Sequence, residues 1–156
     1  MSKLNDAYWM QQALLMAYNA LYQGEVPIGA VLILDLKVIG WGWNCPITNH
    51  DPSAHAEIIA LRQGGKILHN YRLINTTLYV TLEPCIMCAG AIVHSRIKRL
   101  VYGASNIKMG ATKNFFDIFN NLGITHQIEI TAGTMVNECT NVLDNFFKKC
   151  RQKKSL

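Results

Sequence analysis

Two short motifs place three metal-binding side chains in this chain and limit how it can fold. The first is His55-Ala56-Glu57, and the second, about thirty residues later, is Pro84-Cys85-Ile86-Met87-Cys88. A neutral imidazole and two thiolates are good ligands for Zn²⁺, and three protein ligands leave the fourth tetrahedral position free for water. The fold must therefore bring both motifs to one point, and the open position predicts a catalytic site.

The order of these residues, H-x-E and then P-C-x-x-C, is the signature of zinc deaminases. A bound Zn²⁺ lowers the pKa of its water from about 15.7 to roughly 7, which supplies a nucleophile at neutral pH. Glu57 is not needed as a ligand. Its carboxylate can carry a proton from that water to a ring nitrogen and then to the departing amine. The predicted products are a ring carbonyl and ammonia.

Two other interpretations of the cysteine pair stay open. His55, Cys85 and Cys88 could form a closed structural site, but such a site needs a fourth ligand. The remaining cysteines lie in no C-x-x-C arrangement: Cys45, Cys139 and Cys150. The pair could instead be a redox couple, yet it follows a strand-like run, has a proline at a helix start and has an H-x-E partner. We favour the catalytic site over both.

Length and composition indicate one domain covering residues 1–156, half of whose residues are hydrophobic (50%). No run of eighteen apolar residues appears, and the first residues resemble no signal peptide. We therefore expect a cytoplasmic protein without a membrane partner. Five cysteines without a secretion signal indicate metal ligation and buried thiols, not a disulfide framework.

Alternating strand-like and helical patterns predict an α/β sandwich around a mostly mixed sheet. Strands are expected at 28–34, 38–43, 77–82, 99–102 and 127–131, and helices at 6–23, 52–62, 84–95 and from about 136. Asp35-Leu36-Lys37 separates the first two strands, which should form an antiparallel hairpin. Trp41 and Trp43 share one face of the second strand, and we expect them to pack in the core.

The first metal motif is expected at a helix start. Asp51-Pro52 predicts that start, with Asp as the N-cap and Pro in the first helical position. His55 should then lie in the first turn of a helix that runs to Arg62 and ends at Gly64-Gly65. Residues two apart share no helix face, so His55 and Glu57 can converge on one ion only near this start.

The second motif should also lie at a helix start. Pro84 is expected to open a helix that reaches about Ser95, with Cys85 and Cys88 on one face. The positive end of the helix dipole lowers the pKa of thiols placed there. Two helix N-termini are therefore predicted to face a single ion.

Longer stretches of the chain extend the pattern beyond the metal motifs. These are Glu25–Val31, Val38–Gly40, Trp43-Asn44, His50–Ile58, Asn70–Leu73, Thr77–Cys85, Met87–Ala91 and His94–Ile97. Through them, nearly the whole chain resembles the bacterial tRNA-specific adenosine deaminases of the cytidine deaminase-like superfamily. The resemblance implies a three-layer α/β/α fold with a central mixed five-stranded sheet.

The resemblance also implies an activity and its residues. It implies a homodimer, with one Zn²⁺ per subunit, that binds the anticodon stem-loop of tRNA, flips out the wobble adenosine and converts it to inosine. His55, Cys85 and Cys88 would hold the zinc and Glu57 would carry the proton. The implied substrate contacts are Asn44, Ile28, Ala56, Val80, Asn106, Lys108, Phe147 and Arg151. From the residues alone, a loop asparagine that bonds its own backbone is the favoured interpretation of Asn44.

One segment departs from the family pattern. After 101–104 the family usually continues Arg-Asp-x-Lys-x-Gly, whereas this chain has Ser105-Asn106-Ile107-Lys108-Met109-Gly110. Asn106 can still hydrogen-bond a ribose hydroxyl, but unlike a carboxylate it also offers a donor and does not repel phosphate. Our hypothesis is that this change weakens the discrimination between RNA and DNA.

Charge supports a polyanionic partner, since the net charge is +5. Basic residues crowd the C-terminal end and form a second cluster near 96–99: Lys148, Lys149, Arg151, Lys153 and Lys154, then Arg96, Lys98 and Arg99. On charge alone, a basic helix end that complements the helix dipole explains the first group equally well. Given the resemblance, we favour phosphate binding.

Two rival functions stay in view. The first is a deaminase of the same fold acting on a free compound such as guanine, cytosine or cytidine, because the zinc and the glutamate cannot distinguish these substrates. The second is a catalytically silent RNA-binding subunit that keeps zinc for folding, against which the intact Glu57 speaks. The helix that carries 91–94 is a candidate dimer interface, although a core helix would look the same.

Overall fold

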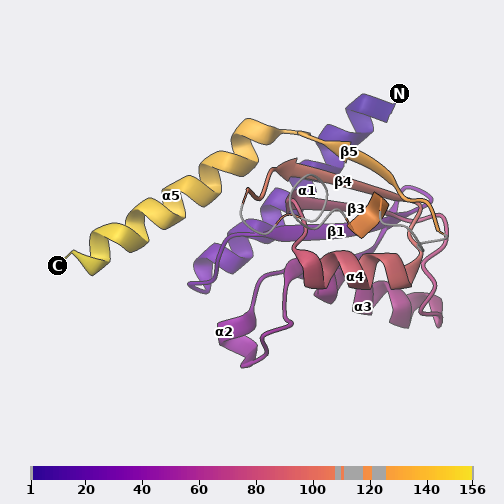
Figure 1. Cartoon of the computed structure of the whole chain (residues 1–156), viewed down its shortest axis with the longest axis horizontal. Helices are drawn as coiled ribbons and strands as arrows, with labels where there is room; N and C mark the ends of the chain where they lie inside the picture. Colours follow the sequence, from indigo (N-terminus) through magenta and orange to yellow (C-terminus); the bar gives the residue numbers. More distant parts are fainter. Residues whose placement is uncertain (1, 108–109, 111–117, 121–125, 156) are drawn as a thin grey trace.

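The structure is a computed structural model that describes residues 2–107, 110, 118–120 and 126–155. The described residues form one sheet with helices on both faces (Figure 1). In chain order the elements are α1 Ser2–Tyr22, β1 Gly29–Leu34, β2 Lys37–Trp43, α2 Pro46–Asn49, α3 Ala56–Leu68, β3 Thr77–Leu82, α4 Ile86–Ser95, β4 Arg99–Ala104, the 3-10 helix η1 Ile118–Asn120, β5 Glu129–Ala132 and α5 Val136–Lys154. Among these helices, none is long and apolar enough to cross a membrane.

The sheet has the order β2-β1-β3-β4-β5 within the described part of the chain. Strand β1 pairs antiparallel with β2 and β3, while β3, β4 and β5 run parallel. The predicted mixed sheet and the β1–β2 hairpin are therefore confirmed. The turn between them uses Asp35 and Leu36, both with positive φ (48° and 61°). Such a turn matches the twist of the strands it connects, although Leu is an unusual residue in it.

Helices α3 and α4 cover one face of the sheet, and α1 and α5 cover the other (Figure 1). Neighbouring strand residues alternate between the two cores, so Leu32 packs toward α3 and α4 while Val31 packs toward α1 and α5. The three-layer arrangement predicted from the sequence is confirmed. The carboxyl ends of the parallel strands β3 and β4 lie next to each other, because Leu82 pairs with Ala104.

Strand β2 lies directly against α3 because two of its residues have no side chain. A Cβ atom at Gly40 would overlap the carbonyl oxygen of Ala60, and one at Gly42 would overlap that of Ala56. Trp41 and Trp43 point to the opposite face, where Trp41 is 37% exposed and Trp43 is half-buried. The prediction that these tryptophans pack in the core is therefore wrong, since the glycines occupy the packed face.

Helix α3 continues past the glycines that were expected to end it. Gly64 lies under the sheet, where a Cβ atom would overlap Leu32 Cδ2. This glycine permits close packing and does not terminate the helix. The helix ends four residues later at Leu68, and His69 follows in the left-handed region, with its N–H near the carbonyl oxygens of Gly65 and Lys66.

Candidate active site

His55 and Cys85 each occupy the N-cap position of a helix that points its N-terminus at the site. Their backbones are extended, and their carbonyl oxygens accept the first helical hydrogen bonds, from Ile59 (3.1 Å) and Ala89 (2.9 Å). Neither side chain caps its own helix. Both side chains are therefore free to bind elsewhere, and the positive ends of two helix dipoles meet at this point.

The expected helix start at Asp51-Pro52 is wrong. Asp51 Oδ1 instead accepts hydrogen bonds from Ser53 N (2.9 Å) and Ser53 Oγ (2.7 Å), which makes a local turn. The helix begins only at Ala56, so His55 precedes the first turn. A short helix, α2, precedes this turn.

The expected start of the second helix is also displaced. Pro84 lies outside α4, which begins at Ile86, so Cys85 caps the helix and Cys88 lies one turn further on. The convergence of the two motifs, however, is found. Ligand atoms of His55, Cys85 and Cys88 all lie within 4.8 Å of one another.

The spacing of these three atoms fits a shared metal ion. His55 Nδ1 lies 3.6 Å from Cys85 Sγ and 3.5 Å from Cys88 Sγ. Tetrahedral Zn²⁺ with Zn–S near 2.3 Å and Zn–N near 2.0–2.1 Å places nitrogen and sulfur about 3.5 Å apart. The near-equal distances from this one ring nitrogen to both sulfurs are those expected for three ligands arranged around one metal centre. Among the described residues, this is the group of three that could hold a metal.

The thiols are prepared for metal binding. Hydrogen bonds with Cys88 and, to a smaller extent, with His55 outweigh burial and together lower the pKa of Cys85 to about 4. That same pairing, together with burial, raises the pKa of Cys88. A proton is therefore shared within the pair, and a metal ion that binds both sulfurs must displace it.

Glu57 lies beside the ligands and is buried. It is only 4% exposed, and burial raises its pKa to about 7. This pKa of about 7 already includes the lowering by the Glu57 backbone N–H, by His55 and by a hydrogen bond with Cys88, and a small rise caused by a negative Cys85. A carboxyl group with a pKa near the working pH can both accept and donate a proton, as the predicted proton carrier must.

Asn44 connects three of the predicted substrate contacts. Its backbone N–H donates to Ile28 O (3.1 Å), and its Oδ1 accepts from the backbone N–H of Ala56 (2.9 Å). This bond orients the amide beside the start of α3, and no described residue accepts a hydrogen bond from Asn44 Nδ2. Val80 is fully buried and belongs to the same core cluster as Ala56.

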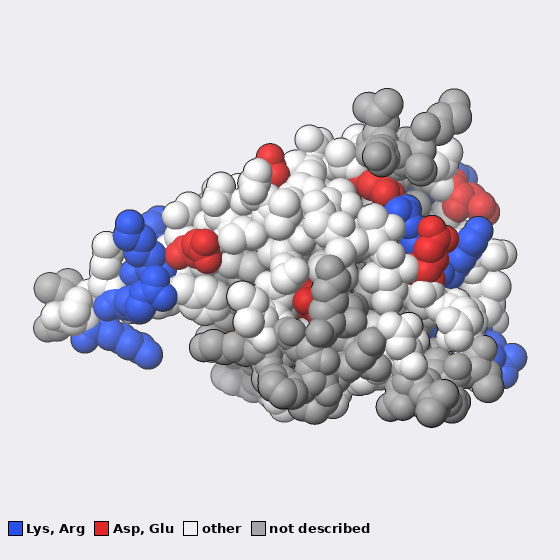
Figure 2. Space-filling view, turned by 45° about the horizontal axis from the view of Figure 1, so that its top comes forward, with Lys and Arg blue, Asp and Glu red and all other residues white. Residues whose placement is uncertain are grey.

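The other predicted contacts gather in a second place. Asn106, Phe147 and Arg151 line one open groove, of about 970 Å³, between α5 and the ends of β3 and β4. The first half of α5 is anchored by three buried residues, Cys139, Val142 and Leu143. Its far end projects from the body (Figure 1), and Lys and Arg side chains gather there (Figure 2). Lys108 lies outside the described residues.

Two buried glutamates near the site were not predicted from the sequence. Glu25 accepts hydrogen bonds from the backbone of Ile47 and Thr48 and from the Thr48 hydroxyl, and so holds α2. Glu83 accepts one from the backbone of Asn106. The sequence signal that could have found them is a lone carboxylate next to an apolar strand. Such a carboxylate is expected to be buried and therefore to need hydrogen-bond partners.

These features define a hydrolytic deaminase: the mixed sheet, the ligands at two converging helix starts, and the buried carboxyl group of Glu57 beside them. The model of the MafB19-like deaminase family matches residues 4–151. A tRNA-specific adenosine deaminase from Haemophilus influenzae is 53% identical over 97% of this chain and 88% of its own length, and one from Buchnera aphidicola subsp. Schizaphis graminum is 53% identical over 97% and 99%. The chain belongs to the tRNA-specific adenosine deaminase family.

Solved structures agree with this assignment. A chain from a study of A-to-I editing by tRNA:A34 deaminases at the wobble position is 41% identical, with a TM-score of 0.84 over 87% of this chain and 99% of that one. A guanine deaminase from Nitrosomonas europaea has a TM-score of 0.72 at 22% identity. That second likeness shows the shared fold alone.

Proposed function

We propose that this protein hydrolyses the 6-amino group of adenosine at the wobble position of a tRNA anticodon, with one Zn²⁺ bound by His55, Cys85 and Cys88. The observation that carries the proposal is the convergence of three ligand atoms, all within 4.8 Å of one another, beside the buried carboxyl group of Glu57. The relatives named as tRNA-specific adenosine deaminases support the substrate. Zn²⁺, when bound, would lower the pKa of a water molecule and so supply a nucleophile at neutral pH.

The side chains then divide the remaining work. Glu57 moves one proton of the attacking water to N1 of the adenine as the oxygen adds to C6, and then moves the remaining hydroxyl proton to the amine, so that C6–N6 breaks, C6=O forms and ammonia departs. Asn44 presents its amide to the target nucleoside, while Ile28, Ala56 and Val80 form the apolar wall. Asn106, Phe147 and Arg151 contact the flanking RNA along the groove beside α5.

A comparison of the substrates in separate reactions tests the proposal. Zinc-loaded protein is incubated with an unmodified tRNA that carries adenosine at the wobble position and, separately, with free adenosine, cytidine and guanine. We expect inosine in the tRNA alone. Conversion of only the free compounds would assign the protein to the rival class of small-molecule deaminases.

The homodimer rests on the family resemblance, with the α4 segment 91–94 as its proposed interface. Sedimentation equilibrium of the zinc-loaded protein should give twice the mass of one chain. A monomer at micromolar concentration would contradict this part of the proposal.

A further inference from the structure

Glu83 lies between the strand ends and the metal-binding helix. Its side chain is almost fully buried (1% exposed), and its backbone N–H donates to Ala104 O (2.8 Å), which continues the β3–β4 pairing by one residue. Its Oε1 accepts a hydrogen bond from the backbone N–H of Asn106 (3.1 Å). Glu83, two positions before the metal ligand Cys85, therefore connects that part of the chain to Asn106, which lines the groove.

Gly110 completes this arrangement from the other side. Its N–H donates to Asn106 O (2.9 Å), and it forms an antiparallel β-bridge with Cys85. A Cβ atom at Gly110 would overlap Glu83 Oε2, so only glycine allows this approach. Asn106 and Gly110 are thus held against the carboxylate at one end and against a metal ligand at the other.

We propose that Glu83 is a positioning residue that sets the distance between the groove and the metal site. It fixes the backbone of Asn106 relative to Cys85, so that a polynucleotide contacted by Asn106 presents its target base at the metal. The inference rests on the proposed function, because it concerns how the same site receives its RNA. Glu83 touches neither the substrate nor the reacting atoms, and its effect passes through Asn106 and Gly110.

The positioning role requires a hydrogen-bond acceptor at a fixed place. An ionised acceptor bonds a backbone N–H more strongly than a neutral one, but either can hold the geometry. Glu83→Gln keeps an oxygen for the Asn106 N–H, whereas Glu83→Ala leaves that group without this acceptor. Comparing the two variants therefore separates positioning from charge.

The experiment measures steady-state deamination of an anticodon stem-loop at equal zinc content. We expect Glu83→Ala to raise KM by about tenfold, equivalent to the removal of one hydrogen bond to a charged group, with kcat within about threefold of the unchanged protein. Glu83→Gln should stay within about threefold on both parameters. An unchanged KM in Glu83→Ala, a loss confined to kcat, or equal impairment of both variants would overturn the inference.

A second variant covers the case in which Glu83→Ala does not fold. Gly110→Ala keeps the carboxylate but forces the backbone at position 110 away from it, so KM should rise while zinc content stays at one per chain. Gly65→Ala is the matched control, because its new Cβ meets only Asn70 O at 3.5 Å, an ordinary contact. A Gly110→Ala protein with the KM of the control would contradict the inference. If the unchanged protein fails to deaminate the stem-loop at all, the proposed function fails instead.

Discussion

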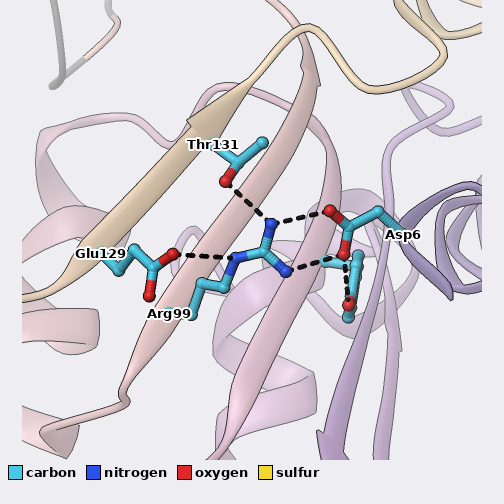
Figure 3. Close-up of polar contacts among 5 residues, drawn as sticks. Asp6, Arg99, Glu129 and Thr131 are labelled. Atoms are coloured by element: carbon cyan, nitrogen blue, oxygen red, sulfur yellow. Dashed lines mark hydrogen bonds and ion pairs between the residues drawn. The ribbon is translucent and has the colours of Figure 1, made fainter. Parts of the chain in front are cut away.

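Arg99 binds Asp6 through two nitrogens of its guanidinium group and so fastens α1 to β4, across 93 positions of sequence. Both N–O distances are 2.7 Å, and the pair is largely buried. Tyr79 OH donates to the same carboxylate (2.8 Å). Arg99 also donates to Thr131 Oγ1 and lies 3.8 Å from Glu129, which brings in β5 (Figure 3). The network ties three strands to the first helix.

This network predicts acid-sensitive stability. Burial alone would raise the pKa of Asp6, but hydrogen bonds from Arg99 and Tyr79 outweigh it and hold the pKa below its usual value. Stabilisation by a lowered carboxyl pKa is complete above the unfolded value of about 4 and is lost as the pH falls below it. Asp6→Asn should cost about 3 kcal/mol in urea unfolding at pH 7, and the deficit should shrink toward pH 3. A deficit that grows on acidification would contradict this sign.

Metal content should depend on the three converging side chains. The purified protein should hold one Zn²⁺ per chain by atomic absorption, and His55→Ala or Cys88→Ala should lose most of it. Acidification should release the metal, because protons compete for the imidazole and the thiolates. Cys139→Ala is the control, since this cysteine lies on the buried side of α5, in the core on the opposite face of the sheet from α3 and α4. Equal zinc in the His55→Ala variant would remove that residue from the ligand set.

Glu57→Gln tests the proton carrier with almost no change in shape. The amide cannot shuttle a proton, so kcat on the anticodon stem-loop should fall by roughly 10²–10⁴-fold. Zinc content and RNA affinity should stay near those of the unchanged protein, because Glu57 is a ligand of neither. An unaltered kcat would exclude Glu57 from the mechanism.

Removal of the projecting end of α5 should weaken RNA binding without unfolding the protein. Ending the chain before Lys148 deletes five cations but keeps the buried anchors Cys139, Val142 and Leu143. The slope of log affinity against log salt should become shallower by about 0.7–0.9 for each phosphate that these cations no longer neutralise. Circular dichroism and zinc content serve as controls. Identical affinity and slope would leave the basic end as a solvated helix terminus.

Asn106, which stands where the family usually has an aspartate, should weaken the preference of the enzyme for RNA over DNA. A single-stranded DNA hairpin with the target base should be deaminated above background. Asn106→Asp should reduce this activity more than activity on the matching RNA, because a carboxylate repels the phosphates of both but gains a hydrogen bond only from the ribose 2′-hydroxyl of RNA. Product formation is measured by mass spectrometry. Absence of any DNA product in the unchanged protein would reject the hypothesis.

The order and chemistry of residues predicted the ligand set, because imidazole and paired thiols at motif spacing have few other uses. Positions at the helix starts were less predictable. Asp51-Pro52 has the chemistry of a helix start, but the hydrogen bond from Ala56 to Asn44 Oδ1 fixes where α3 begins. That bond joins residues twelve apart, and local propensity does not report it.

Packing between distant segments accounts for the remaining differences. Glycine often ends a helix, but Gly64 lies inside α3, where the absence of a side chain lets Leu32 pack directly against the helix. Glu83 and Asn106 are 23 positions apart, and nothing local in the sequence joins them. Residue type thus indicated the chemistry, whereas three-dimensional neighbours decided element ends and supporting partners.

Gly42 of β2 restricts which side chains the active site can accept in the strand beside it. Because Gly42 faces the carbonyl of Ala56, the residue that follows His55, even a methyl group there would push the start of α3 outward. The imidazole would move with it, away from the sulfurs. Strand β2 therefore helps to fix the position of His55 relative to the two cysteines, although it supplies no metal ligand. A larger residue at position 42 would be detected first as a loss of bound metal.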